Sequence, residues 1–303
     1  MACGTLSRKV LNRFYNSLDI GRKVRFHARF ARLFRGRRSG FTDGKWRLRF
    51  GGKTIWVPLR REFAWLDWET SLSLVAHEPE IKQTYLTLMQ LERPPRLVLD
   101  IGANYGTHTV IFLVHGIPTV SFEPNPACHD FIRLLCGANG VSFRLEPMAL
   151  GQGEGQVDLW YPEGETWLGT TDPDVKMQIA GQLTRTAVRQ STVDSYVTTH
   201  GLAPDLLKID TEGADFAVMQ GSVATLKSFR PLVLFESWPS GDRKGLSDFL
   251  EELDYRICRL PLLVNAAPRQ LSREELQIEP GANFAALPAA MLRSWPRAFP
   301  SPA

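Results

Sequence analysis

The sequence contains few cysteines and no long apolar run, and both shortages narrow the kind of protein it encodes. Only four of its 303 residues are cysteine, none in a Cys-x-x-Cys pair, which is too few for a disulfide scaffold of this size. We expect buried or incidental thiols in a reducing compartment. No stretch approaches the roughly 20 apolar residues of a membrane span, and the basic N-terminus lacks the apolar core of a secretory signal. We therefore expect a soluble cytoplasmic protein.

Internal repeats and low-complexity tracts are also missing. The composition, 44% apolar and 22% charged with 24 Gly and 20 Pro, excludes collagen-like, mucin-like and wholly disordered chains. A chain of this length can bury a large core, and it fits one big domain or one domain with an appendage.

Acidic residues are scarce near the N-terminus, and the resulting charge asymmetry divides the chain. Residues 1–62 hold 17 of the 36 Lys and Arg but three acids, a net charge of +14, whereas the remainder is net −10. Such a basic arm attracts nucleic acid or an anionic membrane surface, although contact with its own acidic body needs no partner. We expect residues 1–74 to form a basic extension and a chain cut near residue 62 to keep a folded body.

The arm carries two amphipathic helical patterns and one hairpin signal. Val10 to Leu18 and Phe26 to Phe34 place apolar side chains on single helical faces. Apolar and basic residues alternate over 46–50, and Gly51-Gly52 separates them from a second β-prone run, which predicts a hairpin.

From about residue 78 the pattern changes to short apolar runs that alternate with helical stretches. Continuous apolar strands between helices indicate an α/β fold, a doubly wound, mostly parallel sheet covered on both faces. Most of the runs end in an acid, and ligands sit at the carboxyl edge of such sheets. The predicted strands are Arg96–Asp100, Thr119–Glu123, Val141–Leu145, Leu206–Asp210 and Leu232–Glu236. The long polar segment 151–190 predicts a small hairpin or lid over this edge, or a harmless surface insertion.

The sharpest motif is the turn after the first predicted strand. Asp100 ends the strand, and Gly102 and Gly106 frame a tight turn whose helix N-terminus offers unpaired N–H donors. Two glycines of a dinucleotide-binding turn are absent, and no phosphate loop occurs. Glu123, at the end of the next strand, is placed to accept both hydroxyls of a ribose. We interpret Asp100, Gly102, Asn104, Gly106 and Glu123 as a site for S-adenosylmethionine.

Candidates for catalysis gather at the same predicted edge. Methyl transfer to a hydroxyl needs a base near its proton, and Asp210, Glu212, Glu236 and His108 are the candidates. The three acids also suit a hard cation such as Mg²⁺, which prefers oxygen ligands, although we favour a site without metal. His108 is more readily explained as a packed residue, and Lys208 as an ion-pair partner of one of these acids.

Several segments together resemble the FkbM-type S-adenosylmethionine-dependent methyltransferases over roughly residues 75–290. The Lys-Ile-Asp-x-Glu-Gly segment is the most specific, whereas the Asp-x-Gly turn is shared by many methyltransferases. The resemblance adds Asn125 to the donor-binding candidates. The matching segments are Glu78–Glu80, Leu99–Thr109, Phe122–Pro126, Ala149–Gly151, Thr192–Ser195, Leu207–Gly213, Arg230–Glu236 and Asn283–Pro288.

The resemblance implies a class I, Rossmann-like methyltransferase domain over 75–290, whose seven-stranded sheet has an antiparallel last strand, and leaves 291–303 as a tail. It implies O-methylation of a sugar, glycan or secondary metabolite. Two other interpretations stay open: a nucleic-acid methyltransferase that uses the basic arm, and a non-catalytic S-adenosylmethionine-binding protein. The acid cluster argues against the second, and the missing aromatic-flanked Pro motif of amino-group methylases argues against the first.

Overall fold

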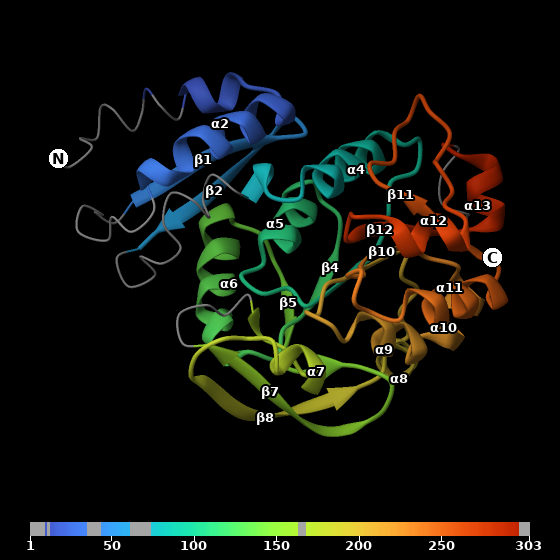
Figure 1. The fold of residues 1–303 in the computed structure, drawn as a ribbon. Coiled ribbons are helices and arrows are strands. Elements are labelled where there is room, and N and C mark those ends of the chain that lie inside the picture. Colours follow the sequence, from blue (N-terminus) through green and yellow to red (C-terminus); the bar gives the residue numbers. More distant parts are fainter. Residues whose placement is uncertain (1–9, 11–12, 35–43, 61–73, 163–167, 297–303) are drawn as a thin grey trace.

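The computed structural model describes residues 10, 13–34, 44–60, 74–162 and 168–296 (Figure 1). Its helices are α2 (Ile20–Phe34), α4 (Pro79–Gln90), α5 (Thr107–Val114), α6 (Pro126–Asn139), α7 (Pro173–Lys176), α8 (Val193–His200), α9 (Asp215–Gln220), α10 (Val223–Phe229), α11 (Arg243–Glu252), α12 (Arg273–Ile278) and α13 (Ala289–Ser294). Its strands are β1 (Gly44–Phe50), β2 (Lys53–Leu59), β3 (Val98–Ile101), β4 (Thr119–Phe122), β5 (Arg144–Glu146), β6 (Ala149–Leu150), β7 (Gly155–Pro162), β8 (Leu183–Ser191), β9 (Leu206–Ile209), β10 (Leu232–Glu236), β11 (Tyr255–Arg259) and β12 (Asn283–Pro288).

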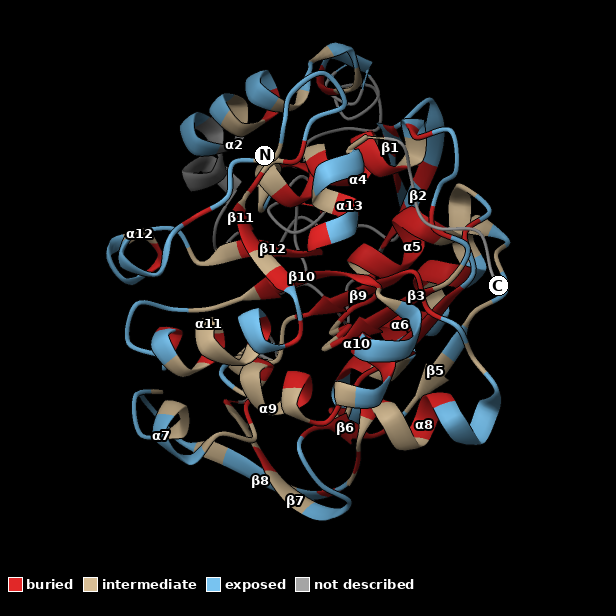
Figure 2. Cartoon of the chain, turned by 90° about the vertical axis from the view of Figure 1, so that its right-hand side faces the viewer, coloured by how far each residue is buried: buried red, intermediate tan, exposed pale blue. Residues whose placement is uncertain are grey.

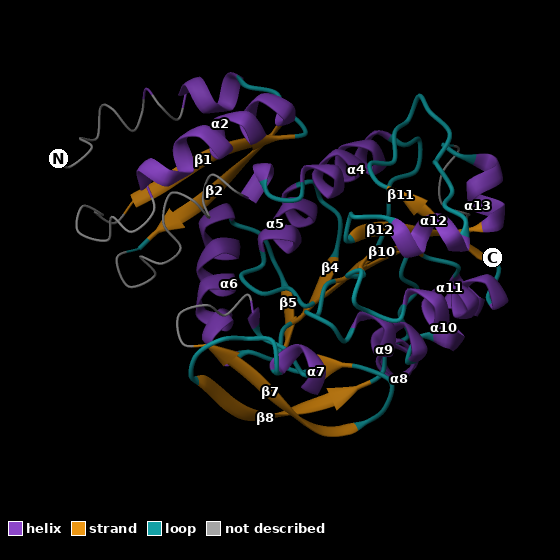
Figure 3. Ribbon diagram, in the orientation of Figure 1, coloured by secondary structure: helices purple, strands orange, loops and turns teal. Residues whose placement is uncertain are grey.

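A seven-stranded sheet forms the centre of the molecule, in the order β11-β12-β10-β9-β3-β4-β5 (Figure 3). The five apolar runs of the sequence become β3, β4, β5, β9 and β10, and the printed pairs among them are parallel. Strand β12 pairs antiparallel with both β10 and β11. The doubly wound, mostly parallel sheet and its antiparallel last strand are therefore confirmed.

Two apolar cores, one on each face, bury the central strands (Figure 2). Successive side chains of a strand point to opposite faces, so Val98 joins one cluster while Leu99 and Ile101 join the other. Helices α4, α5 and α6 contribute to the first cluster, and α8 to α12 to the second. Burial on both faces explains why these strands read as continuous apolar runs.

Local signals set where the helices begin and end. Helix α6 begins at Pro126, because the Asn125 side chain accepts a hydrogen bond from the Ala127 backbone N–H at 3.0 Å. It ends at Gly140, whose φ of 64° lies in the left-handed region. The sequence predicts one helix over 214–226, but the structure divides it into α9 and α10. At the break, a Cβ on Gly221 would stand 2.0 Å from the carbonyl oxygen of Gly151.

The long polar segment forms a second sheet of three strands, ordered β6-β8-β7. Strands β7 and β8 pair antiparallel, which confirms the predicted hairpin. This sheet lies at the opposite end of the molecule from α2 (Figures 1 and 2). Trp167, one of the aromatic residues of this segment, lies outside the described residues.

The basic N-terminal region differs from the expected dispensable arm. The hairpin of β1 and β2 is present as predicted, with Gly51 and Gly52 at its turn. Its inward side chains, including Trp46, Leu48 and Ile55, belong to the same apolar cluster as α4, α5 and α6. Apolar alternation in the hairpin thus serves the main core rather than a separate unit. Cutting the chain near residue 62 would expose that core, so the structure argues against a dispensable extension.

The folded part continues past residue 290, where the sequence predicts the start of a tail. Helix α13 crosses the predicted start of the tail, and Met291 is buried in the first cluster. Residues 297–303 lie outside the described part. Cys128, Cys136 and Cys258 are buried, as expected, whereas Cys3 lies outside the described residues. Among the helices that the structure describes, none has the length and apolar character to cross a membrane.

Candidate active site

An open pocket lies at the carboxyl edge of the central sheet, between the ends of β3, β4 and β9 and the inserted sheet. The empty space within it is about 620 Å³, which includes space open to solvent. Of the donor-binding candidates, Gly102, Asn104 and Glu123 line it, together with the catalytic candidates Asp210 and Glu212. Apolar lining comes from Ile101, Phe122, Met148, Ala149, Leu150 and Leu159.

The glycine turn after β3 is required by its neighbour as much as by any ligand. Gly102 has a φ of 80°, and a Cβ there would stand 1.7 Å from the carbonyl oxygen of Asp210. Only glycine therefore lets the turn pass the end of β9. Asn104 also adopts a left-handed φ of 47°. Gly106 packs against Ile132 and is not among the pocket's lining residues.

Glu123 holds the pocket wall through its two carboxylate oxygens. Oε2 accepts the Asn104 backbone N–H at 2.6 Å, and Oε1 accepts the Asn125 backbone N–H at 2.7 Å. Burial raises the pKa of Glu123 to about 7, against the lowering effect of these two hydrogen bonds. The residue thus fixes the glycine turn and still presents a carboxyl group to the pocket. Asn125 itself caps α6, and its Nδ2 is buried with no hydrogen-bond partner among the described residues.

Asp100 lies in the sheet rather than on the pocket wall. It is fully buried, and Oδ2 accepts a hydrogen bond from Thr109 Oγ1 at 2.5 Å. Oδ1 stands 4.0 Å from Lys208 Nζ and has no hydrogen-bond partner among the described residues. Asp100 thus lies behind the glycine turn, and its role as a donor ligand stays a prediction.

Three carboxyl groups meet where β9 and β10 end. Oxygen atoms of Asp210, Glu212 and Glu236 lie within 4.8 Å of one another, so the structure brings the three acidic candidates together. Lys208 Nζ donates to Asp210 Oδ2 at 2.8 Å, which confirms the predicted ion pair. The charges of Asp210 and Asp100 raise the pKa of Lys208 although burial lowers it. Lys208 is thus a charged, buried partner of the cluster.

Two carboxyl groups of this cluster, those of Glu212 and Glu236, resist ionisation. Burial, followed by the charges of Asp210 and Asp215, raises the pKa of Glu212 to about 8. Burial and the charges of Asp210, Glu212 and Asp215 raise that of Glu236 to about 9. Two carboxyl groups are thus poised to exchange a proton near neutral pH.

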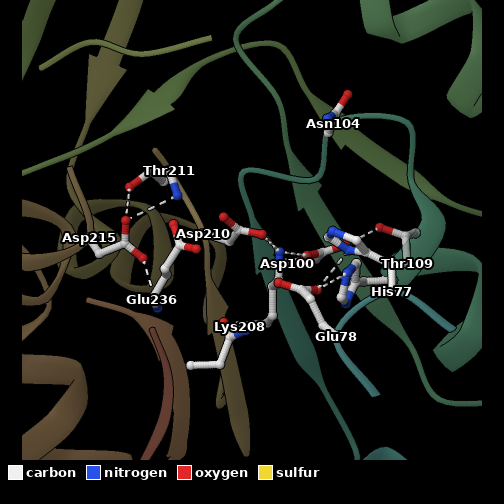
Figure 4. Close-up of polar contacts among 12 residues, drawn as sticks. His77, Glu78, Asp100, Asn104, Thr109, Lys208, Asp210, Thr211, Asp215 and Glu236 are labelled. Carbon is white, nitrogen blue, oxygen red and sulfur yellow. Dashed lines mark hydrogen bonds and ion pairs between the residues drawn. The ribbon is translucent and has the colours of Figure 1, made fainter. Parts of the chain in front are cut away.

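Asp215 is a member of this cluster that the sequence analysis does not identify. Its pKa rises to about 6 through burial and the charge of Asp210. Its oxygens accept hydrogen bonds from Thr211 and from the Glu236 backbone N–H at 3.2 Å. It therefore ties the end of β9 to the end of β10 (Figure 4). The sequence Asp-Thr-Glu-Gly-Ala-Asp could have pointed to Asp215, because its last residue begins helix α9 directly after the end of β9.

His108 lies apart from the pocket lining, in a buried cluster with residues of α4. Its Nδ1 is 2.7 Å from Tyr85 Oη, and its Nε2 is 3.1 Å from Lys82 Nζ and 3.2 Å from Glu78 Oε2. Burial and the charge of Lys82 lower the pKa of His108 to about 3. The imidazole is neutral and hydrogen-bonded, so the structure supports packing rather than catalysis for His108.

Glu78 and Lys82 make that cluster electrically balanced. Burial would raise the pKa of Glu78, but the charge of Lys82 and hydrogen bonds from His108 and His77 hold it well below its usual range. Lys82 Nζ donates to Glu78 Oε2 at 3.1 Å. In Figure 4, Glu78 and His77 lie on one side of Lys208 and Asp100, and Asp210, Asp215 and Glu236 on the other. The sequence analysis quotes Glu78 only within a motif and misses Lys82.

The inserted segment packs directly on the acid cluster. Thr170 Oγ1 donates to the carbonyl oxygen of Glu212 at 2.7 Å. Glu212 has a left-handed φ of 52°, and a Cβ on the following Gly213 would stand 2.5 Å from Val175 of α7. Gly169, Thr171 and Leu159 line the pocket. The insertion is thus one wall of the site rather than a remote surface loop.

The family of the chain follows from comparison with known proteins. The model of the methyltransferase FkbM domain matches residues 100–257, more than half of the chain. The chain therefore belongs to the FkbM methyltransferase family, as its motifs suggest. A comparison with curated proteins finds no match.

Similar solved structures are methyltransferases. The methyltransferase FkbM of Methylobacillus flagellatus KT is 12% identical with a TM-score of 0.40, and the match covers 72% of this chain and 54% of that one. The T. thermophilus 16S rRNA N2 G1207 methyltransferase, in complex with AdoMet and guanosine, is 14% identical with a TM-score of 0.42, covering 82% and 51%. The Pyrococcus abyssi tRNA (uracil-54, C5)-methyltransferase, in complex with S-adenosyl-L-homocysteine, is 13% identical with a TM-score of 0.38, covering 81% and 44%. The chain spans about half the length of each.

Proposed function

We propose that the protein transfers a methyl group from S-adenosylmethionine to a hydroxyl group of a sugar, glycan or secondary metabolite. The observation that carries this proposal is the group of carboxyls at the ends of β9 and β10, two of which have pKa values raised to about 8 and 9 beside an open pocket. Membership of the FkbM methyltransferase family supports the reaction class.

The residues that line the pocket fit a nucleoside donor. Glu123 is placed to accept ribose hydroxyls while it holds the turn of Gly102 and Asn104. The apolar lining that includes Phe122, Met148 and Leu150 suits a flat base. Asn125 Nδ2, a buried donor atom without a partner among the described residues, stands beside Glu123 in sequence. Acidic groups at the other end of the pocket suit a ligand that carries positive charge.

When bound, S-adenosylmethionine supplies a methyl group on a positively charged sulfur. The chain's own task is to hold the acceptor hydroxyl in line, exclude water and take up its proton. A carboxyl group whose pKa lies near the working pH suits that proton transfer. We assign it to the ionised form of Glu212 or Glu236, which accepts the hydroxyl proton as the oxygen–methyl bond forms and the sulfur–methyl bond breaks.

Asp210 acts on both of these glutamates. Its charge raises the pKa of Glu212 and of Glu236, and its pairing with Lys208 holds the end of β9 in place. We propose that Asp210 orients the acceptor and sets the basicity of its neighbours. In this role, it remains more important for turnover than for donor binding.

The alternative of a Mg²⁺ site uses the same three acids. Asp210 is already compensated by Lys208, and Glu236 Oε2 accepts a hydrogen bond from the Trp238 indole N–H at 2.9 Å. These partners support a site that works without metal. We expect turnover in EDTA to match turnover with added Mg²⁺, and a dependence on Mg²⁺ would contradict this assignment.

The donor site is tested by calorimetry with S-adenosylhomocysteine, the demethylated donor. Glu123→Ala removes a charged hydrogen-bond acceptor worth about 1.5–3 kcal/mol, so binding should weaken roughly tenfold or more. Glu146→Ala is the matched control, because Glu146 ends the neighbouring strand β5 without lining the pocket. Unchanged affinity in folded Glu123→Ala would contradict the placement of the ribose.

The acceptor class is tested by incubation with methyl-labelled S-adenosylmethionine. Cell extracts are fractionated into lipid, glycan, small-molecule and nucleic-acid pools, and we expect label in the glycan or small-molecule pool. Label in the nucleic-acid pool, together with salt-dependent retention on a nucleic-acid column, would favour the nucleic-acid methyltransferase instead. Donor binding without labelling of any pool would favour a non-catalytic protein.

A further inference from the structure

One large aromatic side chain stands exposed at the mouth of the acid cluster. Trp238 follows β10, and 53% of its surface is accessible. Its indole N–H donates to Glu236 Oε2 at 2.9 Å, so the ring is anchored to a carboxyl group of the site. An indole that is wet on its face and hydrogen-bonded at its nitrogen is the arrangement in which tryptophan contacts ligands.

The loop that carries Trp238 is held from beneath by a buried arginine. Arg243 is 1% exposed, and it donates to the carbonyl oxygens of Ser237 at 2.6 Å and Gly281 at 2.7 Å. The Ser237 backbone N–H donates to the carbonyl oxygen of Ala282 at 2.7 Å. A turn closed from the Gly241 N–H to the Trp238 carbonyl at 3.0 Å completes the support. The indole is thus presented from a braced loop, as a binding residue requires.

Trp238 contacts the acid cluster through Glu236 and is not among the residues that line the donor pocket. The pocket lining reaches Asp210 and Glu212 but includes neither Glu236 nor Trp238. Glu236 nevertheless meets the other two acids within 4.8 Å, and Trp238 bonds Glu236. The indole is thus linked to the acids through Glu236. An acceptor hydroxyl that contacts Glu236 brings the rest of the acceptor close to the indole.

The chemistry of this subsite favours a sugar ring. A pyranose has hydroxyl groups at its rim and an apolar C–H face, and the electron-rich face of an aromatic ring packs against such C–H groups. Carboxyl oxygens at one side of the indole accept hydrogen bonds from several hydroxyls at once. An aromatic acceptor would use the indole but few of the carboxyls.

We propose that Trp238, with the carboxyl groups of Glu212 and Glu236, forms the acceptor subsite, in which the indole stacks on the C–H face of a pyranose. The inference rests on the proposed function, because it names the acceptor of the same reaction. Trp238 is a specificity-determining residue: it positions the ring, while the acids contact the hydroxyl that is methylated.

The test measures binding of small probes to the full-length protein saturated with S-adenosylhomocysteine. Methyl glycosides of hexoses and 6-deoxyhexoses are titrated by ligand-observed NMR, with catechol and glucosamine as the competing classes. Trp238→Ala should weaken glycoside binding roughly fivefold to tenfold, and Trp238→Phe, which keeps a ring, should stay within about threefold of the unsubstituted protein. Trp56→Ala removes a half-exposed tryptophan of β2 outside the pocket and should change nothing.

The possible outcomes distinguish failure of the acceptor subsite from failure of the proposed function. Glycosides that bind Trp238→Ala as tightly as the unsubstituted protein overturn the subsite, as does a Trp238→Phe as weak as Trp238→Ala. Preference of the unsubstituted protein for catechol or glucosamine over every glycoside also overturns it. Failure to bind S-adenosylhomocysteine at all would instead contradict the proposed function. Donor affinity unchanged in all three variants, with only glycoside binding altered, supports the inference.

Discussion

Two groups of ionisable side chains flank Lys208, and they are built in opposite ways. On one side, Glu78, Lys82 and His108 alternate in charge and hydrogen-bonding capacity, and the pKa of Glu78 falls well below its usual range. On the other side, carboxyl groups face one another, and the pKa values of Glu212 and Glu236 rise to about 8 and 9. Burial disfavours the ionised carboxyl in both groups, but only around Glu78 does a neighbouring opposite charge offset it.

The contrast separates structural from chemical roles. A balanced buried cluster lowers its own electrostatic energy and has little tendency to exchange protons. A cluster of like charges destabilises the folded state, and such clusters gather at functional sites. The neutral His108 belongs to the first kind, and this explains why a histidine at the edge of the site is not needed as a base.

The largest expected effect is on turnover, when the like-charge cluster is altered. Asp210→Asn removes the charge that raises the pKa values of its neighbours, and it breaks the ion pair with Lys208. We therefore expect kcat to fall by about 10²–10⁴, with donor affinity within a few-fold. His108→Gln is the contrasting variant, and its folded fraction should keep kcat within a few-fold. Turnover assays and calorimetry on both measure this, and normal turnover in Asp210→Asn with only a lowered Tm would contradict the assignment.

Breaking the balanced cluster should instead cost stability. Glu78→Gln leaves Lys82, whose side chain is 2% exposed, without its opposing charge, and loss of one partner of a buried pair costs about 3–5 kcal/mol. Urea unfolding at pH 7 measures the free energy of unfolding. The double variant Glu78→Gln with Lys82→Met removes the stranded charge and should regain part of the loss. A double variant less stable than Glu78→Gln would show that the pair is not the source of the cost.

The sequence predicts the members of the acid cluster better than their roles. Apolar runs that end in an acid place Asp210 and Glu236 at one edge, because parallel strands share a direction. The face that Asp100 occupies depends on where α5 packs, and no local pattern encodes that. The partners of His108 come from α4, 23 to 30 residues earlier, so only the fold brings them together. The basic charge of the N-terminal region suggests a separate arm, but its alternating apolar residues, such as Trp46 and Leu48, pack in the main core.

A third expected effect concerns the pH dependence of stability. The pKa of Glu236 is raised to about 9 in the folded protein from 4.5, so the folded state binds its proton more tightly than the unfolded state. Its contribution to stability is complete below pH 4.5 and is lost as the pH rises through 9. Glu236→Gln cannot titrate, so its Tm relative to the unsubstituted protein should increase between pH 5 and 9. Glu274→Gln, at an exposed position, should show no such trend.

The central claim, that burial and neighbouring like charges hold Glu212 and Glu236 protonated near neutral pH, is tested most directly by titration of these two carboxyl groups. ¹³C NMR of glutamate side chains in the full-length protein, assigned through Glu212→Gln and Glu236→Gln, follows both without any acceptor. We predict coupled midpoints near pH 8 and 9 that shift to lower pH in Asp210→Asn, since that substitution removes a charge that raises both. Midpoints near 4.5 in the unsubstituted protein, or midpoints that Asp210→Asn leaves in place, would contradict the account.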